Sequence, residues 1–111
     1  GIRIAQDGLF GKTAKLPKIE LKQPTTAIAE STSDAINSGI VIGYIGMIDK
    51  LIDTIEDEMV ERLGIKKSDI NIIATGGFSE LISQSSDYIN TIEPDLMLEG
   101  LRIIYERNHE R

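Results

Sequence analysis

The feature that most constrains the fold is the stretch at residues 33–63, whose apolar side chains recur mostly every three or four positions. This spacing places them on one face of an α-helix, and such a face is normally buried. The polar residues 31–34 are of the types that cap helix N-termini, and Gly64 is of the type that ends helices. We therefore predict one long helix from about Ser33 to Leu63, with a buried face that includes Ile36, Ile40, Ile48, Ile52, Ile55, Met59 and Leu63.

Shorter segments on both sides of this helix alternate between strand and helix patterns. Strands that alternate with helices are typical of an α/β layer with a largely parallel sheet. The predicted fold class is therefore α/β, with the long helix packed on a small, mostly parallel sheet. The expected elements are a helix at 3–13, strands at 18–21, 69–75 and 88–92, a helix at 78–85, and a last helix from 94 to about 108.

The predicted sheet is too small to form a self-sufficient layer. With two or three strands, its edges and faces are left uncovered, so we expect the chain to belong to something larger or to pair with a second copy. The chain also begins at Gly1 without a cap before its first element, which indicates an engineered or processed fragment. In the last helix, the expected buried side consists of Leu98, Leu101, Ile104 and Tyr105.

Composition excludes several classes of function. The 12 basic and 18 acidic residues give a net charge of −6, which disfavours binding to nucleic acid. The absence of cysteine excludes disulfides, thiolate zinc sites and cysteine nucleophiles, and it fits a cytoplasmic protein. The most apolar run, Ile40–Ile48, is shorter than the ~20 residues that cross a bilayer, so no membrane association is expected. His109 lies in a charged tail, so we expect neither a catalytic triad nor a metal site.

A pair of glycines follows the predicted buried strand at 69–75. Gly76 and Gly77 lack a Cβ, which allows the backbone to approach a ligand closely, and the helix that follows offers free N–H groups. Ligands of parallel sheets bind at the carboxyl ends of strands, where this turn lies. The alternative interpretation is a plain tight turn.

Two features belong to the long helix. At its start, Thr32 lies among polar residues that either cap the helix or bind a small polar ligand. Inside it, Gly39, Gly43 and Gly46 lie on one stripe, although each glycine costs ~1 kcal/mol relative to alanine in a helix. We interpret this stripe as a close packing face or a dimer face, with ligand contact as the less favoured alternative.

Five stretches, in order, resemble the type III pantothenate kinase family. Residues 9–17 are similar to the family's "aLf-x-x-tAkLP", and residues 32–39 to "T-x-x-A-[IM]-[QN]-[SA]-G". Residues 42–47 resemble "x-G-Y-[VI]-G-M", and residues 73–77 resemble "[VI]-A-T-G-G". Residues 98–108 resemble the family's C-terminal signature, so the resemblance covers almost the whole chain.

The resemblance implies a fold and an activity. Residues 1–111 would be the C-terminal part of an actin-like (ribonuclease H-like) kinase domain. The implied reaction is the phosphorylation of pantothenate by ATP with Mg²⁺, the first step of coenzyme A biosynthesis. The family also implies a monovalent cation (K⁺ or NH₄⁺), a cytoplasmic location and a homodimer.

The resemblance assigns roles to three residues. Thr32 falls on the family's pantothenate-binding threonine, and Gly76 and Gly77 fall on the adenosine motif of the superfamily, where they would bind the nucleotide. The chain departs from the family at Ala29 and Ser31, which replace a glycine and an asparagine, and at Met97, where threonine is common.

The family's N-terminal phosphate loop and its catalytic aspartate have no counterpart in these 111 residues. We therefore assign no catalytic residue and expect the chain alone to be inactive, because phosphoryl transfer needs metal, phosphate cradle and base together. The leading hypothesis is part of a pantothenate kinase. The alternatives are a non-catalytic accessory factor of the same fold and a dimerisation module.

Overall fold

The computed structural model describes residues 1–12 and 19–109, and its longest element is helix α2, Thr32–Leu63. The hydroxyl of Ser31 caps its start by accepting a hydrogen bond from the backbone N–H of Asp34 at 3.2 Å. At its end, Gly64 adopts a left-handed conformation (φ 65°) and donates its N–H to the carbonyl of Val60. Glycine tolerates this conformation because it has no Cβ. The predicted long helix is confirmed.

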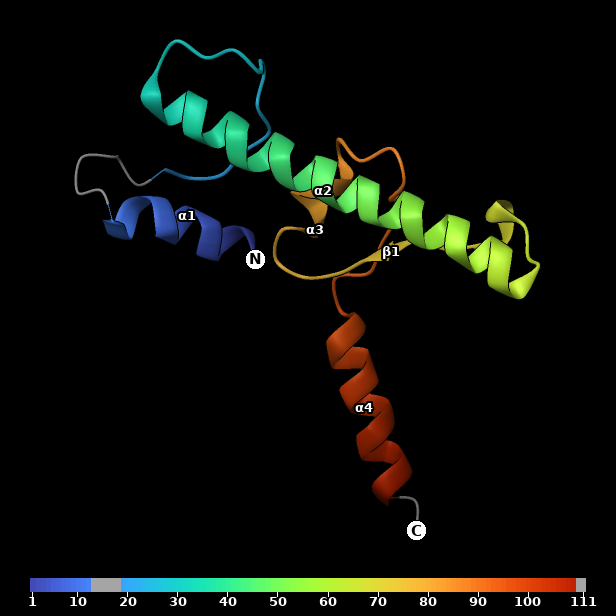
Figure 1. Ribbon diagram of the computed structural model, residues 1–111. Helices are drawn as coiled ribbons and strands as arrows, with labels where there is room; N and C mark the ends of the chain where they lie inside the picture. The colour runs from blue at the N-terminus through green and yellow to red at the C-terminus, as the bar shows by residue number, and fades with distance from the viewer. Residues whose placement is uncertain (13–18, 110–111) are drawn as a thin grey trace.

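Six other elements precede or follow α2 in the described chain (Figure 1). Helix α1 lies alongside the N-terminal half of α2, whereas α3 lies beside its middle. The predicted helices are confirmed in order, although residue 13 of the first one lies outside the described residues. The elements are α1 (Ile2–Lys12), the 3-10 helix η1 (Lys67–Asp69), β1 (Ile73–Ala74), α3 (Ser79–Ser83), β2 (Thr91–Ile92) and α4 (Leu96–His109).

Strands β1 and β2 form a parallel two-stranded sheet, in which Ile73 pairs with Thr91 and Ala74 with Ile92. The backbone N–H of Glu93 extends this pairing by donating to the carbonyl of Ala74 at 2.9 Å. The predicted α/β class with a small parallel sheet is confirmed. Each strand is only two residues long, much shorter than predicted, and no third strand pairs with them among the described residues.

The strand predicted at 18–21 is wrong for the part that the structure describes. Residues 19–21 are not in a strand, and residue 18 lies outside the described residues. The next residue, Lys22, bonds through its backbone to the side chain of Asn37 on α2 instead of to a neighbouring strand. An alternating pattern indicates a half-buried segment, and here a helix provides the burial.

The core is small and lies around the N-terminal half of α2. Its buried apolar side chains are Ile2 of α1 together with Ile40, Val41 and Ile45 of α2. The predicted burial of Ile40 is confirmed. Further along α2, the prediction is wrong for two positions, because Ile55 is 51% exposed and Leu63 is 62% exposed. Periodicity identified an apolar face there, but the described chain covers it only in part, since Ile52 and Met59 are half-buried.

Helix α4 projects away from the rest of the molecule and packs on no other described element (Figure 1). The predicted burial of its apolar side is therefore wrong in this chain: Leu98, Leu101, Ile104 and Tyr105 are all more than half exposed. The helix itself is confirmed, and the pattern was correct in marking its apolar side.

Among the described residues, α2 has the length and apolar composition that a membrane-spanning helix needs, with a mean hydropathy of 1.4 over an 18-residue window. Of this window, 28% is buried inside the chain. Core helices of soluble proteins meet the same criterion, so the feature does not distinguish the two. The expectation that the chain does not bind membranes stays a prediction.

Candidate functional site

The start of α2 presents Thr32 as the first residue of the helix, with an exposed side chain. The capping hydrogen bond is made by the neighbouring Ser31 hydroxyl, which also lies 3.5 Å from the hydroxyl of Ser33. The capping interpretation of this stretch is therefore confirmed for Ser31. The ligand-binding role of Thr32 stays a prediction.

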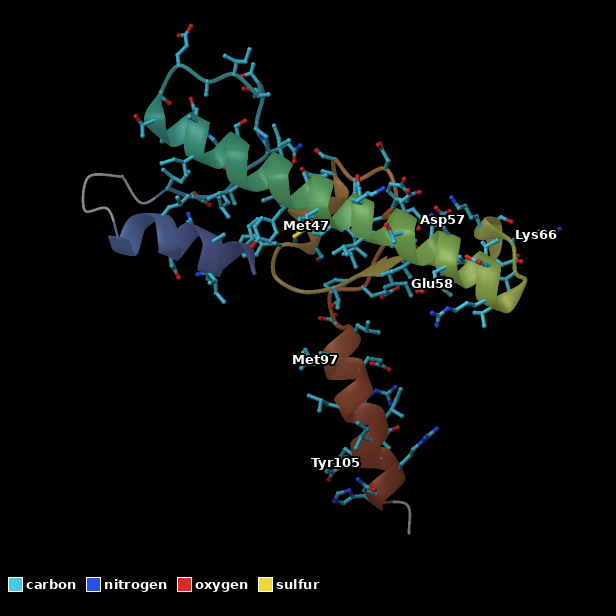
Figure 2. The ribbon with its side chains drawn as sticks, in the orientation of Figure 1. Met47, Asp57, Glu58, Lys66, Met97 and Tyr105 are labelled. Atoms are coloured by element: carbon cyan, nitrogen blue, oxygen red, sulfur yellow. The ribbon has the colours of Figure 1, made fainter. Side chains whose placement is uncertain are left out.

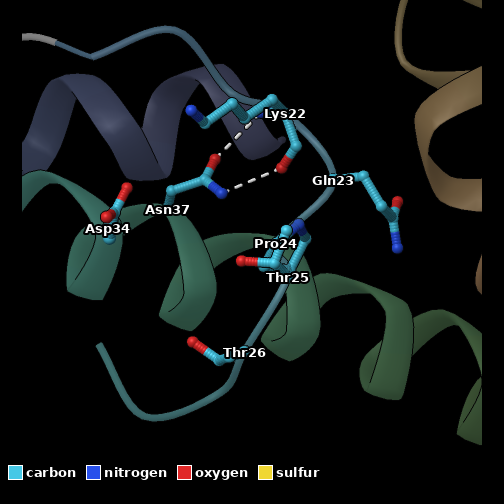
Figure 3. A pocket seen from close by; sticks show the side chains of 7 residues that line it. All are labelled: Lys22, Gln23, Pro24, Thr25, Thr26, Asp34 and Asn37. Carbon is cyan, nitrogen blue, oxygen red and sulfur yellow. Dashed lines mark hydrogen bonds between the residues drawn. The ribbon is translucent and has the colours of Figure 1, made fainter. Parts of the chain in front are cut away.

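The segment that leads into Thr32 is fixed to α2 by two buried polar side chains. Asn37 is 3% exposed; its Oδ1 accepts from the Lys22 backbone N–H at 2.9 Å, and its Nδ2 donates to the Lys22 carbonyl at 2.9 Å (Figure 3). Ser38, 4% exposed, donates its hydroxyl to the carbonyl of Ala27 at 2.9 Å. Buried polar groups satisfied in this way define one conformation, because breaking a bond would leave an unpaired group.

These bonds frame a small polar pocket of about 140 Å³ between the segment and the first turns of α2 (Figure 3). It offers the charges of Lys22 and Asp34, threonine hydroxyls and the Asn37 amide, which are groups that orient a small polar ligand. A neighbouring pocket of about 340 Å³ is more apolar and reaches Ile42, Ile45 and Ser85. The lining residues of the polar pocket are Lys22, Gln23, Pro24, Thr25, Thr26, Asp34 and Asn37.

The sequence analysis missed this pocket. The signal that could have found it is Asn37 together with Ser38, two polar residues one turn before the buried Ile40 and Val41 on the covered side of the helix. Polar residues in such positions need buried partners. A sequence alone does not say that the partners are backbone groups of residues 22 and 27.

Gly76 and Gly77 form the turn between β1 and α3. Gly76 has φ of 104°, a conformation that L side chains rarely adopt. Its carbonyl accepts both the backbone N–H of Ser79 at 3.2 Å and the Ser79 hydroxyl at 2.8 Å. The tight-turn interpretation is therefore confirmed at Gly76. The nucleotide-binding role of the pair stays a prediction.

The structure does not bring Thr32 and the two glycines together. The segment just after α3 reaches the middle of α2, because the Ser86 hydroxyl donates to Asp49 and Ser85 lines a pocket together with Ile45. At ~1.5 Å per residue, Ile45 lies roughly 20 Å along the helix from Thr32. Neither Thr32 nor either glycine lines any of five pockets found between described residues.

The glycine stripe of α2 is exposed. At Gly39, Gly43 and Gly46, a Cβ would meet nothing within 4 Å. Close packing within the described chain, one of the two preferred interpretations of this stripe, is therefore wrong. The dimer interpretation stays a prediction.

A further pocket of about 340 Å³ lies near the C-terminal half of α2 and contains more acidic than basic groups. Lys67 of η1 lies 2.9 Å from Asp57 and 3.8 Å from Asp53, and the hydrogen bond and charge of Asp57 raise the pKa of the Lys67 ammonium. The pKa of the Tyr88 hydroxyl is raised mainly by desolvation, and a hydrogen bond to Asp53 raises it further. Within the described residues, no group of three or more histidine or carboxylate side chains could hold a metal ion.

Comparison with known proteins shows a family to which this chain is similar. The profile of the type III pantothenate kinase family matches residues 1–54. A type III pantothenate kinase of Finegoldia magna is 46% identical over 108 residues, which is 97% of this chain. The chain is therefore similar to type III pantothenate kinases over almost its whole length. It spans 40% of the length of the Finegoldia relative.

The buried amide of Asn37 yields a prediction about stability. Asn37→Ala leaves the Lys22 N–H and carbonyl without partners and is expected to lower the free energy of unfolding by about 2 kcal/mol. Urea denaturation followed by circular dichroism measures the change. Asn90→Ala is the control at an exposed asparagine and is expected to change stability by less than about 0.5 kcal/mol. Equal effects of the two substitutions would contradict the proposed anchoring of the segment.

The turn at Gly76 yields a second prediction, with its neighbour as a matched control. Gly76→Ala forces a Cβ into a left-handed conformation and is expected to cost about 1 kcal/mol or more. Gly77→Ala meets no neighbour and has no positive φ, so it is expected to be nearly neutral. Thermal unfolding of the two variants measures the difference. A Gly76 variant as stable as the Gly77 variant would show that the turn has a different conformation.

Proposed function

We propose that this chain forms the C-terminal part of an actin-like, type III pantothenate kinase, which transfers the γ-phosphoryl group of ATP to a pantothenate hydroxyl. The observation that carries the proposal is the 46% identity to the Finegoldia kinase over 97% of this chain. The family profile over residues 1–54 supports it independently. The observed order of helices and strands and the parallel pairing of β1 with β2 are compatible with the second lobe of such a kinase.

Within the parent enzyme, Thr32 binds pantothenate, and Gly76 and Gly77 bind the nucleotide. The exposed Thr32 side chain at a helix N-terminus supports the first role, because such a position can hydrogen-bond a small polar substrate. The positive φ of Gly76 supports the second, because a backbone without Cβ can lie flat against a ligand. Since the described chain does not join the two places in one pocket, the rest of the enzyme closes the site around both substrates.

The cofactors are ATP with Mg²⁺ and a monovalent cation, K⁺ or NH₄⁺. Phosphoryl transfer needs metal ions that bridge the phosphate oxygens and neutralise the developing charge. The protein ligands of these ions lie outside the 111 residues. The enzyme works in the cytoplasm and binds neither nucleic acid nor membranes; the net charge of −6 supports the absence of nucleic-acid binding.

Activity tests the proposed function. In an assay of pantothenate-dependent ADP release with Mg²⁺ and K⁺, the chain alone is expected to give no turnover above the background. Turnover is expected when the chain is combined with a polypeptide that comprises the remaining 60% of the Finegoldia kinase. In that mixture, Thr32→Val removes one hydrogen bond and is expected to raise the pantothenate KM about tenfold without changing the ATP KM.

Thr54→Val is the matched control for Thr32→Val. The Thr54 hydroxyl donates to the carbonyl of Lys50 within α2, and its side chain is exposed. Its substitution is expected to leave both KM values unchanged. Family-level turnover by the isolated chain would contradict its assignment as an inactive part. A reconstituted enzyme whose pantothenate KM responds to neither substitution would contradict the role of Thr32.

A specific observation also supports a homodimer formed through the glycine stripe. The open space at Gly39, Gly43 and Gly46 allows a second helix to approach the bare backbone closely. Such an approach compensates for the low helix propensity of three glycines.

The stripe yields a prediction about the oligomeric state. Gly43→Leu meets no neighbour within the chain but blocks close approach, and it is expected to convert a dimer to a monomer. Light scattering coupled to size-exclusion chromatography gives the mass. Leu51→Ala, at an exposed apolar residue of the same helix, is the control and is expected to leave the dimer intact. A wild-type chain that is monomeric at high concentration would contradict the dimer.

A further inference from the structure

Helix α4 carries an apolar stripe that no described element covers. Five side chains define this α4 stripe, and each is between 57% and 77% exposed. In Figure 2, Met97 and Tyr105 extend from the same side of the helix. Their spacing of one, three and four residues confines the stripe to about a third of the helix circumference. The members of the stripe are Met97, Leu98, Leu101, Ile104 and Tyr105.

Three charged side chains outside the α4 stripe are paired with one another within the helix. Arg102 donates to Glu106 at 2.6 Å and also forms an ion pair with Glu99, whose hydrogen bond to Arg102 lowers the pKa of the Glu99 carboxyl. These three side chains therefore need no external partner and can face water. The helix therefore combines the apolar α4 stripe with a paired charged cluster, and two further apolar residues, Leu96 and Ile103, lie outside the stripe.

A helix of 14 residues such as α4 is marginal in water without tertiary packing. Its exposed stripe must be covered for the helix to be a stable part of a protein. Partner side chains along the stripe would span about 12 Å, the axial distance from Met97 to Tyr105 at ~1.5 Å per residue. The stripe contains no charged residue, so the surface that it fits is an apolar groove.

The size of the uncovered surface distinguishes between possible partners. The radius of gyration of the described chain is 18.1 Å, whereas a compact domain of this length has about 13 Å. Apolar residues are also exposed on β1 and on α2, such as Ile73 (51%) and Leu51 (55%). A second copy that covers one helix would leave these other faces open. The Finegoldia relative contains a further 60% of polypeptide, which is large enough to cover several of them.

We propose that the α4 stripe docks into an apolar groove on the part of the kinase that corresponds to the remaining 60% of the Finegoldia relative. This inference rests on the proposed function, in which the chain is one part of a larger enzyme. In this arrangement, α4 joins the two parts of the enzyme, and the charged side of α4 stays in solvent. A second copy of this chain is the competing occupant.

The test measures association of the full chain with a separately produced polypeptide comprising that remaining part of the Finegoldia kinase. A 1:1 complex is expected by light scattering, and α4 amides are expected to become protected from hydrogen exchange on mixing. Leu101→Lys is expected to raise the Kd about 30-fold or more, because it places an ammonium group at the centre of an apolar interface. Glu106→Lys places the same group on the polar side and is expected to change the Kd less than about threefold.

The readout is independent of catalysis, so an associated but inactive pair would contradict the proposed kinase function and leave the docking of α4 supported. Absence of a wild-type complex, or equal effects of the two substitutions, would overturn the docking. Self-association of the chain alone that Leu101→Lys abolishes would assign the stripe to a second copy instead. If the separate polypeptide is insoluble, the test uses a single polypeptide that joins the two parts. In this fused protein, Leu101→Lys is expected to lower Tm by several degrees more than Glu106→Lys. Equal decreases in Tm would overturn the proposal.

Discussion

The burial of Asn37 and Ser38 under the preceding segment is the interaction on which the N-terminal half of the described structure depends. Two neutral side chains of α2 bond the backbone of residues 22 and 27, which are distant in sequence, and so hold the approach to Thr32 against the helix. Helix α1 and the small core of four apolar side chains lie around this same half of α2. The polar pocket exists because these bonds hold the segment in place.

Sequence periodicity predicted the helices well, because the helical pattern depends only on residues three or four positions apart in the sequence. It identified α2 to within a residue at each end and marked the apolar side of α4 correctly. Periodicity could not predict whether each apolar face is buried, since burial depends on which other parts of the polypeptide pack against it. Ile55, Leu63 and the α4 residues are apolar in pattern but exposed in this chain. The prediction of a strand at 18–21 was wrong for a related reason. An alternating pattern indicates a half-buried segment but does not identify the element that covers it.

The candidate site was predictable only in part. The glycine pair pointed to a turn, and the φ of Gly76 shows that one of the two glycines is required by the backbone. Thr32 was chosen through the family resemblance and is found at an exposed helix start. The small polar pocket was not predicted, because its lining combines a helix with a segment that has no regular secondary structure. The chain spans 40% of the length of the Finegoldia kinase, so most of that relative has no counterpart in these residues.

The two halves of α2 are held by bonds of different physical kinds. Near its start, the neutral bonds of Asn37 and Ser38 are buried, so dissolved ions have little influence on them. Near its end, η1 is tied to the helix through Lys67, whose partners Asp53 and Asp57 are largely or partly exposed. Exposed charges are screened over about 10 Å at 0.1 M ionic strength. Rising salt is therefore expected to weaken the tie between η1 and α2, while the neutral bonds near Thr32 are expected to persist.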